Sequence, residues 1–200
     1  ALRGETVQVL FEMTLRNLCE QGAIDHQDFL DRVDILSAVG GSLGEGTKIL
    51  VSNHAEFHRL ADYLFRYTKK PVGLVMGLPT LRALFEESFY EDLEGGILES
   101  FGRLFRNDLR LYVQPAREEG GLVTVDTLRV AQHLRLLYRH LLESGGIRAL
   151  DDVCEEYLST HARDVLSRLR SGDESWTEQV PAEAVGLIRE RGLLGYRPPA

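Results

Sequence analysis

Hydrophobic and polar positions follow two different periods in the first half of the chain, and this predicts extended and helical segments in turn. Residues 6–15 are rich in apolar and β-branched side chains. The same positions also fit one face of a helix, and of these two interpretations we choose a strand. Short apolar runs at residues 48–52 and 72–76 are typical of buried strands, and strict alternation over residues 109–113 predicts a fourth strand that Pro115 closes.

Helical periodicity fills the intervals between these strands. Asp25 is placed to cap a helix through Val39, and the Gly40-Gly41 pair predicts the end of that helix. A second helix is expected from Glu56 to Tyr67, with Ser52 or Asn53 as its N-cap. Two further helices are predicted over residues 79–90 and 97–105.

Strands and helices that alternate in this way are typical of right-handed βαβ crossovers and of a parallel sheet covered on both faces. We therefore predict an α/β fold with a three-layer, Rossmann-like core around a short, mostly parallel sheet. Beyond Pro115 the pattern becomes helical, apart from one short edge strand near Val123. Residues 1–116 are expected to form the core, and residues 117–200 a helical extension packed on it. The extension is predicted to contain helices over residues 126–143, 151–170 and 181–191.

Composition and charge narrow the class of protein. The chain has 23 Lys and Arg against 31 Asp and Glu, a formal net charge of -8, so we expect no nucleic-acid partner. No apolar run approaches the roughly 20 residues that span a bilayer, and the first residues lack the order of a secretory signal. No membrane partner and a cytoplasmic location are therefore expected. Cys19 and Cys154 lie far apart, which favours free thiols over a disulfide.

Ligands of open parallel sheets bind beyond the carboxyl ends of the strands, and this rule selects the candidate residues. The catalytic candidates at these ends are Glu12, Thr14, Asn17 and Ser52. The candidates for ligand binding are Asn53, His54, Gly95, Gly96 and Arg103. The Gly95-Gly96 pair starts a predicted helix, so its amides could receive an anion or could simply be part of a helix cap. Arg103, Arg106 and Arg110 could form a local basic patch or solvated ion pairs.

No metal or cofactor is identified. His54 and His58 have the i,i+4 spacing at which two helical histidines can chelate zinc, but no third ligand accompanies them and Glu56 does not give the His-Glu-x-x-His order. We therefore predict no metal site. The chain also lacks a nucleophile elbow, a Walker loop, a dinucleotide fingerprint and a Cys-x-x-Cys pair.

Residues 9–15, VLFEMTL, resemble the first motif of the haloacid-dehalogenase-like phosphohydrolases, an apolar strand that ends in Asp-x-Asp-x-Thr. Residues 49–52 resemble their second motif, an apolar strand that ends in Ser or Thr. The resemblance implies a core of that type. Glu12 stands where the family has its nucleophilic Asp, Thr14 stands where it has its general acid, and the Gly-Asp-x-x-x-Asp magnesium motif is missing. These departures imply a non-catalytic relative.

A second resemblance extends over nearly the whole chain, which is similar to the C-terminal half of a family of longer, mostly uncharacterised bacterial proteins. Some members carry the labels nicotinate-nucleotide adenylyltransferase or TonB-dependent receptor. This chain lacks the His-x-Gly-His of such adenylyltransferases, so the resemblance transfers no catalytic residue. It implies a bacterial protein whose missing N-terminal half is a partner of this chain. The segments that carry it are LFEMTLRNL (10–18), DFLDRVDIL (28–36), GGILESFGRLF (95–105), DLRLYV (108–113), HLRLLYRHLLESG (133–145), SGDESW (171–176) and GLLGY (192–196).

Two hypotheses of function follow. The first is a binding or interaction module of a larger protein, which contacts a phosphorylated or nucleotide-like ligand. The alternative is a divergent phosphohydrolase or nucleotide-handling enzyme, haloacid-dehalogenase-like or related to nucleotidyltransferases, that uses Glu12, Asn17 and Ser52. A homo-oligomer formed through the segment around Trp176 is a further possibility.

Overall fold

The computed structural model of the 200-residue chain describes residues 7–15, 19–20, 23–43, 46–151 and 153–199. It is a mixed α/β structure whose sheets are small and mostly parallel, as predicted. Contacts between residues define two compact units. The first unit contains residues 1–55 and 160–200, and the second contains residues 56–159. These bounds differ from the expected core of residues 1–116 and extension of residues 117–200.

The first unit contains a two-stranded parallel sheet of β1 (Leu10–Thr14) and β4 (Lys48–Ser52). The strand interpretation of the opening segment is therefore confirmed over these five residues, and the helical one is wrong there. A short antiparallel pair, β2 (Cys19–Glu20) and β3 (Ala23–Ile24), precedes helix α1 (His26–Ser42). Because α1 lies between the two parallel strands in the chain, β1, α1 and β4 form a βαβ unit.

Helix α1 begins where the sequence predicts and ends later. The Asp25 carboxylate accepts hydrogen bonds from the backbone N–H groups of Gln27 and Asp28, as expected of an N-cap. The predicted end at Gly40-Gly41 is wrong, because the helix continues to Ser42. A Cβ atom on Gly40 would lie 3.1 Å from Cγ2 of Thr47, so this glycine allows the helix to approach the residue just before β4 closely.

The C-terminal helices complete the first unit with a core that α1 also contacts. They are α6 (Ala162–Ser171), η5 (Glu174–Gln179), α7 (Ala182–Arg191) and η6 (Leu193–Gly195). Trp176 is fully buried at the centre of this core, so its ring is not presented for self-association. Helix α7 packs against α1, and Arg191 pairs with Asp34 at 2.6 Å. The helix predicted over residues 151–170 is wrong in its first part, where the described residues before α6 form only the short η4 (Glu155–Tyr157).

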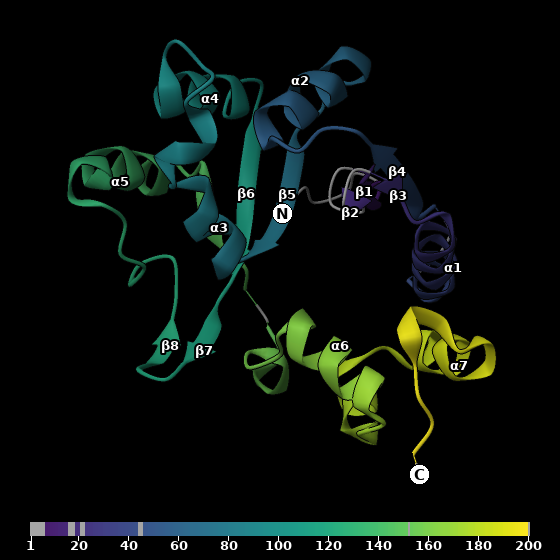
Figure 1. The fold of residues 1–200 in the computed structure, drawn as a ribbon. Helices are drawn as coiled ribbons and strands as arrows, with labels where there is room; N and C mark the ends of the chain where they lie inside the picture. The colour runs from purple at the N-terminus through teal and green to yellow at the C-terminus, as the bar shows by residue number, and fades with distance from the viewer. Residues whose placement is uncertain (1–6, 16–18, 21–22, 44–45, 152, 200) are drawn as a thin grey trace. The chain divides into compact units, whose positions relative to one another are not determined.

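The second unit is built on a three-stranded parallel sheet in the order β5-β6-β9. Strands β5 and β6 lie side by side in Figure 1. Strands β5 (Val72–Gly77) and β6 (Leu109–Gln114) match the prediction, whereas β9 (Ile147–Ala149) was not predicted. The four strands expected in one sheet thus pair as two separate parallel sets in the described part of the chain. The alternating apolar side chains of β6 are buried on the inner face of the sheet, as the period-2 pattern requires.

Helices surround this sheet, and some of them are shorter than predicted. They are α2 (Phe57–Tyr67), α3 (Leu78–Leu84), η2 (Glu87–Tyr90), α4 (Gly96–Leu104), η3 (Gln132–Leu134) and α5 (Arg135–Glu143). The N-cap position of α2 is Glu56, so the expected caps Ser52 and Asn53 are wrong. The helix predicted from residue 126 starts later, with η3 at Gln132 and α5 at Arg135. The predicted start lies instead in a turn in which the Thr127 hydroxyl accepts the N–H of Thr124.

A short hairpin of β7 (Ala116–Glu118) and β8 (Gly121–Val123) follows β6. A strand near Val123 is therefore confirmed, but it pairs with β7 in a separate two-stranded sheet and does not form an edge of the parallel sheet. Arg82 on α3 pairs with Glu118 of this hairpin at 3.0 Å. No helix in the described part of the chain has both the length and the apolar character needed to cross a bilayer.

Candidate functional site

The carboxyl ends of β1 and β4 bring together three of the predicted site residues. Thr14 lies opposite Ser52 in the parallel register, and Glu12 lies two residues earlier on the same face of the sheet. The Ser52 hydroxyl donates a hydrogen bond of 2.6 Å to the Glu12 carboxylate and accepts one of 3.2 Å from the backbone N–H of His54. The structure therefore places Glu12 and Ser52 in direct contact on these paired strands.

Few other functional side chains accompany Glu12 and Ser52 among the described residues at this edge. Thr14 is buried, and its hydroxyl has no hydrogen-bond partner among the described residues. Asn53 is exposed and His54 is half-buried, while Asn17 lies outside the described residues. The part of the chain that the structure describes contains no group of three or more His, Cys, Asp or Glu that could hold a metal ion. Glu12 and Ser52 thus form a hydrogen-bonded pair without a neighbouring set of carboxylates.

Removing the Ser52 hydroxyl tests whether this pair stabilises the edge. We expect Ser52→Ala to lower the free energy of unfolding by about 1–2 kcal/mol, because Ser52 is buried and its hydrogen bond to a carboxylate is charge-assisted. Urea denaturation followed by circular dichroism measures the change. The exposed Ser37 on α1 provides the control, and Ser37→Ala should change stability by less than about 0.5 kcal/mol. Equal effects of the two substitutions would contradict the expected role of the pair.

The remaining predicted ligand-binding residues, Gly95, Gly96 and Arg103, belong to the second unit, where they lie on or next to α4. The Gly95 N–H donates a 3.0 Å hydrogen bond to the Glu99 carboxylate, and Arg103 pairs with the same carboxylate at 2.6 Å. Gly96 has a φ of +54°, which favours glycine. The chain's own Glu99 therefore occupies the start of this helix, as in a helix cap.

The two histidines with zinc-like spacing do not share a helix. His54 precedes α2 and belongs to the first unit, whereas His58 is on α2 in the second unit. The assumption that both lie on one helix is therefore wrong. His58 is buried, and its Nδ1 atom lies 3.0 Å from the hydroxyl oxygen of Ser100 on α4.

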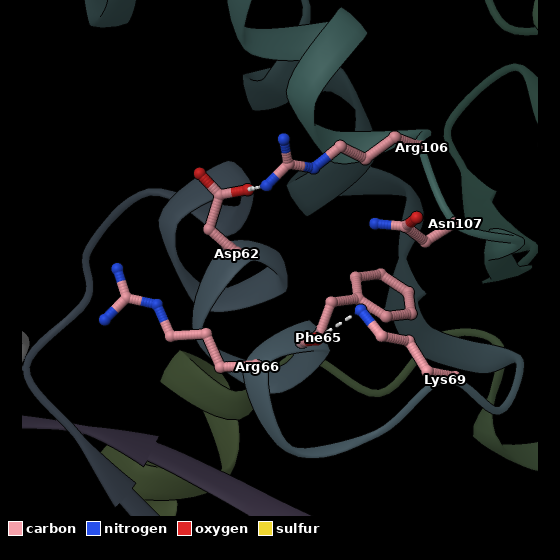
Figure 2. A pocket seen from close by; sticks show the side chains of 6 residues that line it. All are labelled: Asp62, Phe65, Arg66, Lys69, Arg106 and Asn107. Atoms are coloured by element: carbon pink, nitrogen blue, oxygen red, sulfur yellow. Dashed lines mark hydrogen bonds and ion pairs between the residues drawn. The ribbon is translucent and has the colours of Figure 1, made fainter.

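A hollow of about 350 Å³ on the second unit gathers basic side chains that the candidate set did not include. We call it the basic hollow; Figure 2 shows its lining, with four residues from α2 and the residues just after it, and two from the loop between α4 and β6. The lining residues are Asp62, Phe65, Arg66, Lys69, Arg106 and Asn107. In the sequence, the signal that could have indicated this hollow is the i,i+3 spacing of Arg66 and Lys69 near a predicted helix end, together with Arg106.

Charge and hydrogen bonding order the basic hollow. Arg106 is paired with Asp62, and the Lys69 amino group donates a 3.4 Å hydrogen bond to the Phe65 carbonyl (Figure 2). Asn107 has a φ of +58°, which Asn tolerates better than most residues, and its side chain points into the region between α2 and the loop (Figure 2). Three cations and one carboxylate leave the lining with a net positive charge, so this concave surface is suited to an anion.

A second hollow, of about 450 Å³, lies on the first unit between the end of α1 and the start of β4. Its lining carries no ionisable side chain, so it offers no group for acid–base or ionic chemistry. The lining residues are Leu36, Ser37, Gly40, Gly41, Gly46, Thr47 and Ile49.

Comparison with known proteins returns no relative. No family model, curated protein or solved structure matches this chain. The two family resemblances therefore stay predictions.

Proposed function

We propose that this chain is a binding module and that its basic hollow takes a phosphorylated or nucleotide-like ligand. The observation that carries the proposal is the gathering of Arg66, Lys69 and Arg106 around one hollow, in a chain whose formal net charge is -8. Cations distributed at random over the surface are not expected to line the same hollow. Three cations on the lining of one hollow raise the local concentration of anions at this point of an otherwise acidic protein.

The donors in the basic hollow suit phosphate oxygens. Guanidinium groups donate paired hydrogen bonds to phosphate, and Lys69 supplies a compact positive charge. The Asn107 amide adds a neutral donor. Phe65 is almost fully buried, so its ring offers little surface for a base to stack on. The hollow is near the lower end of the roughly 300–1,000 Å³ range of ligand pockets, so we assign recognition to the phosphate groups and not to a base.

The proposal includes a Rossmann-like, haloacid-dehalogenase-like core. The βαβ arrangement of β1, α1 and β4, and the parallel order β5-β6-β9, both support a Rossmann-like architecture. The pairing of the two motif-like strands, with Glu12 and Ser52 in hydrogen-bond contact, supports a haloacid-dehalogenase-like relationship. We place the module in a larger, cytoplasmic bacterial protein whose other half is its partner.

A divergent phosphohydrolase is the second candidate, favoured by the contact between Glu12 and Ser52 at the strand ends. It has less support, because the described residues provide no carboxylate cluster for the metal on which such chemistry relies. Phosphatase assays with the wild-type chain and with Glu12→Gln separate the two candidates. Turnover that Glu12→Gln abolishes would establish the enzyme, whereas a binding module gives no turnover in either protein.

Charge reversal in the basic hollow tests the proposed binding. Isothermal titration with pyrophosphate and with ADP at pH 7.5 should show saturable binding that weakens as salt is raised, because the charges are exposed. We expect Arg66→Glu and Lys69→Glu each to weaken binding by about tenfold or more.

The matched control is Arg135→Glu, which changes the net charge equally at an exposed position of α5 outside the hollow. It should leave binding within about twofold of the wild-type value, the scale of a distant, screened charge. Absence of binding by the wild-type chain, or equal losses in all three variants, would contradict a ligand site at the basic hollow.

A further inference from the structure

One buried polar contact joins α2 to α4, the two helices that lead into the basic hollow. His58 and Ser100 are each only 2% exposed, and the His58 Nδ1 atom lies 3.0 Å from the Ser100 hydroxyl oxygen. The other ring nitrogen of His58, Nε2, is buried without a hydrogen-bond partner among the described residues. A neutral imidazole can leave that nitrogen without a proton, whereas an imidazolium would bury an unpaired N–H and a positive charge.

The charges around His58 do not compensate for this burial. Burial is the main cause that lowers the pKa of His58, and Arg59 and Arg103 lower it further. Glu56 and Asp62 act in the opposite direction, but each of them is paired with an arginine. Strand β5 carries no titratable side chain. From η2, the Tyr90 hydroxyl donates to the Leu84 carbonyl, and burial raises its pKa to about 12, so it stays uncharged.

The same two helices hold the opposite sides of the basic hollow. Helix α2 carries Asp62 and Arg66, and it ends just before Lys69. Helix α4 ends at Leu104, two residues before Arg106, which Asn107 follows. The contact between His58 and Ser100 therefore lies within the helix pair whose spacing sets the width of the hollow.

We propose that the His58–Ser100 contact holds α2 and α4 together in an acid-sensitive way, and we call this contact the fastening. Protonation of His58 separates the two helices and moves the lining residues of the basic hollow apart. The bound phosphate ligand is then released on acidification. The release of ligand rests on the function proposed above, whereas the separation of the helices does not.

The direction of the effect follows from the lowered pKa. An opened or unfolded second unit binds a proton on His58 at its ordinary pKa of 6.5, and the closed unit binds it only at lower pH. The contact is therefore fully stable above about pH 6.5 and loses stability as the pH falls below that value. Between the two pKa values the opening equilibrium shifts by up to about tenfold for each pH unit.

The first test measures opening without any ligand. Amide hydrogen exchange of α2 and α4, corrected for its intrinsic pH dependence, is recorded between pH 5 and pH 8 for the wild-type chain, for His58→Gln and for the exposed control His140→Gln. We expect opening of the wild-type helices to increase severalfold between pH 6.5 and pH 5.5, an increase that His140→Gln keeps and His58→Gln loses. Equal pH dependence in all three proteins would overturn the fastening.

A nuclear magnetic resonance titration of the His58 ring protons in the wild-type chain covers the case in which His58→Gln fails to fold. A pKa clearly below 6.5 supports the proposal, and a pKa at or above 6.5 overturns it.

The second test measures pyrophosphate affinity over the same pH range. Pyrophosphate changes its own protonation state over this pH range, but this change affects the wild-type chain, His140→Gln and His58→Gln equally. The wild-type chain and His140→Gln should lose affinity severalfold more steeply than His58→Gln as the pH falls from 6.5 to 5.5. Identical pH profiles would overturn the release of ligand. No binding at pH 7.5 would instead overturn the proposed function and the release that rests on it, and the fastening would then be decided by hydrogen exchange.

Discussion

Phe101→Ala is expected to destabilise the second unit by about 3–5 kcal/mol, the range found when a buried phenylalanine is removed and its cavity stays open. Phe101 is on the buried face of α4 and makes edge contacts with Phe85 at 5.0 Å, with Phe105 at 5.8 Å and with Tyr90 at 6.3 Å between ring centroids. Removal of one ring therefore affects several aromatic pairs at once. Urea denaturation followed by far-ultraviolet circular dichroism measures the loss.

Phe89 provides the control for this substitution, because it lies on η2 in the same unit and is 64% exposed. Phe89→Ala should change the free energy of unfolding by less than about 0.5 kcal/mol. A loss below about 1 kcal/mol for Phe101→Ala would show that the aromatic rings do not form the core described here.

Trp176→Ala should have a comparable effect on the first unit, with a loss of about 3–5 kcal/mol. Trp176 is fully buried among Leu169, Ile188 and their neighbours, and its ring lies 5.9 Å from that of Tyr196. Since α1 packs against the same core, the substitution should increase hydrogen exchange in both α1 and α7.

Leu30→Ala provides the comparison, because Leu30 is an exposed residue of α1. That substitution should leave exchange in α7 unchanged. Wild-type protection of α7 in Trp176→Ala would contradict a common core for the C-terminal helices and α1.

The strands could be predicted from the sequence because their signals are local. Residues 48–52 and 72–76 are short apolar runs next to helical patterns, and the structure places strands over both ranges. Strand β9 could not be found in this way, because only three residues of it pair with β6. The late end of α1 was missed for a different reason, since the close approach of Thr47 to Gly40 involves residues that local propensity does not relate.

One part of the candidate site could be predicted from the sequence and the other could not. The meeting of Glu12 with Ser52 follows from two parallel strands that end at one edge, and it could be inferred. The lining of the basic hollow comes from the end of α2 and from the loop after α4. Because these residues lie far apart in the sequence, no spacing motif predicts the hollow.

The arginine cluster at residues 103–110 shows the same limit of local reasoning. Arg103, Arg106 and Arg110 each pair with a different carboxylate, as the ion-pair interpretation of this stretch predicts. Only Arg106 lines the hollow. Neighbouring positions in the sequence thus do not identify which cation lines the hollow.

Mapping of pyrophosphate binding by nuclear magnetic resonance tests the proposed ligand site most directly, because it reports where binding occurs as well as whether it occurs. With backbone amides assigned at pH 7.5, a titration should move the signals of Arg66, Lys69, Arg106 and Asn107 most, and should leave those of Glu12 and Ser52 unchanged. Largest shifts at the ends of β1 and β4, or no saturable shifts anywhere, would contradict a phosphate site at the basic hollow.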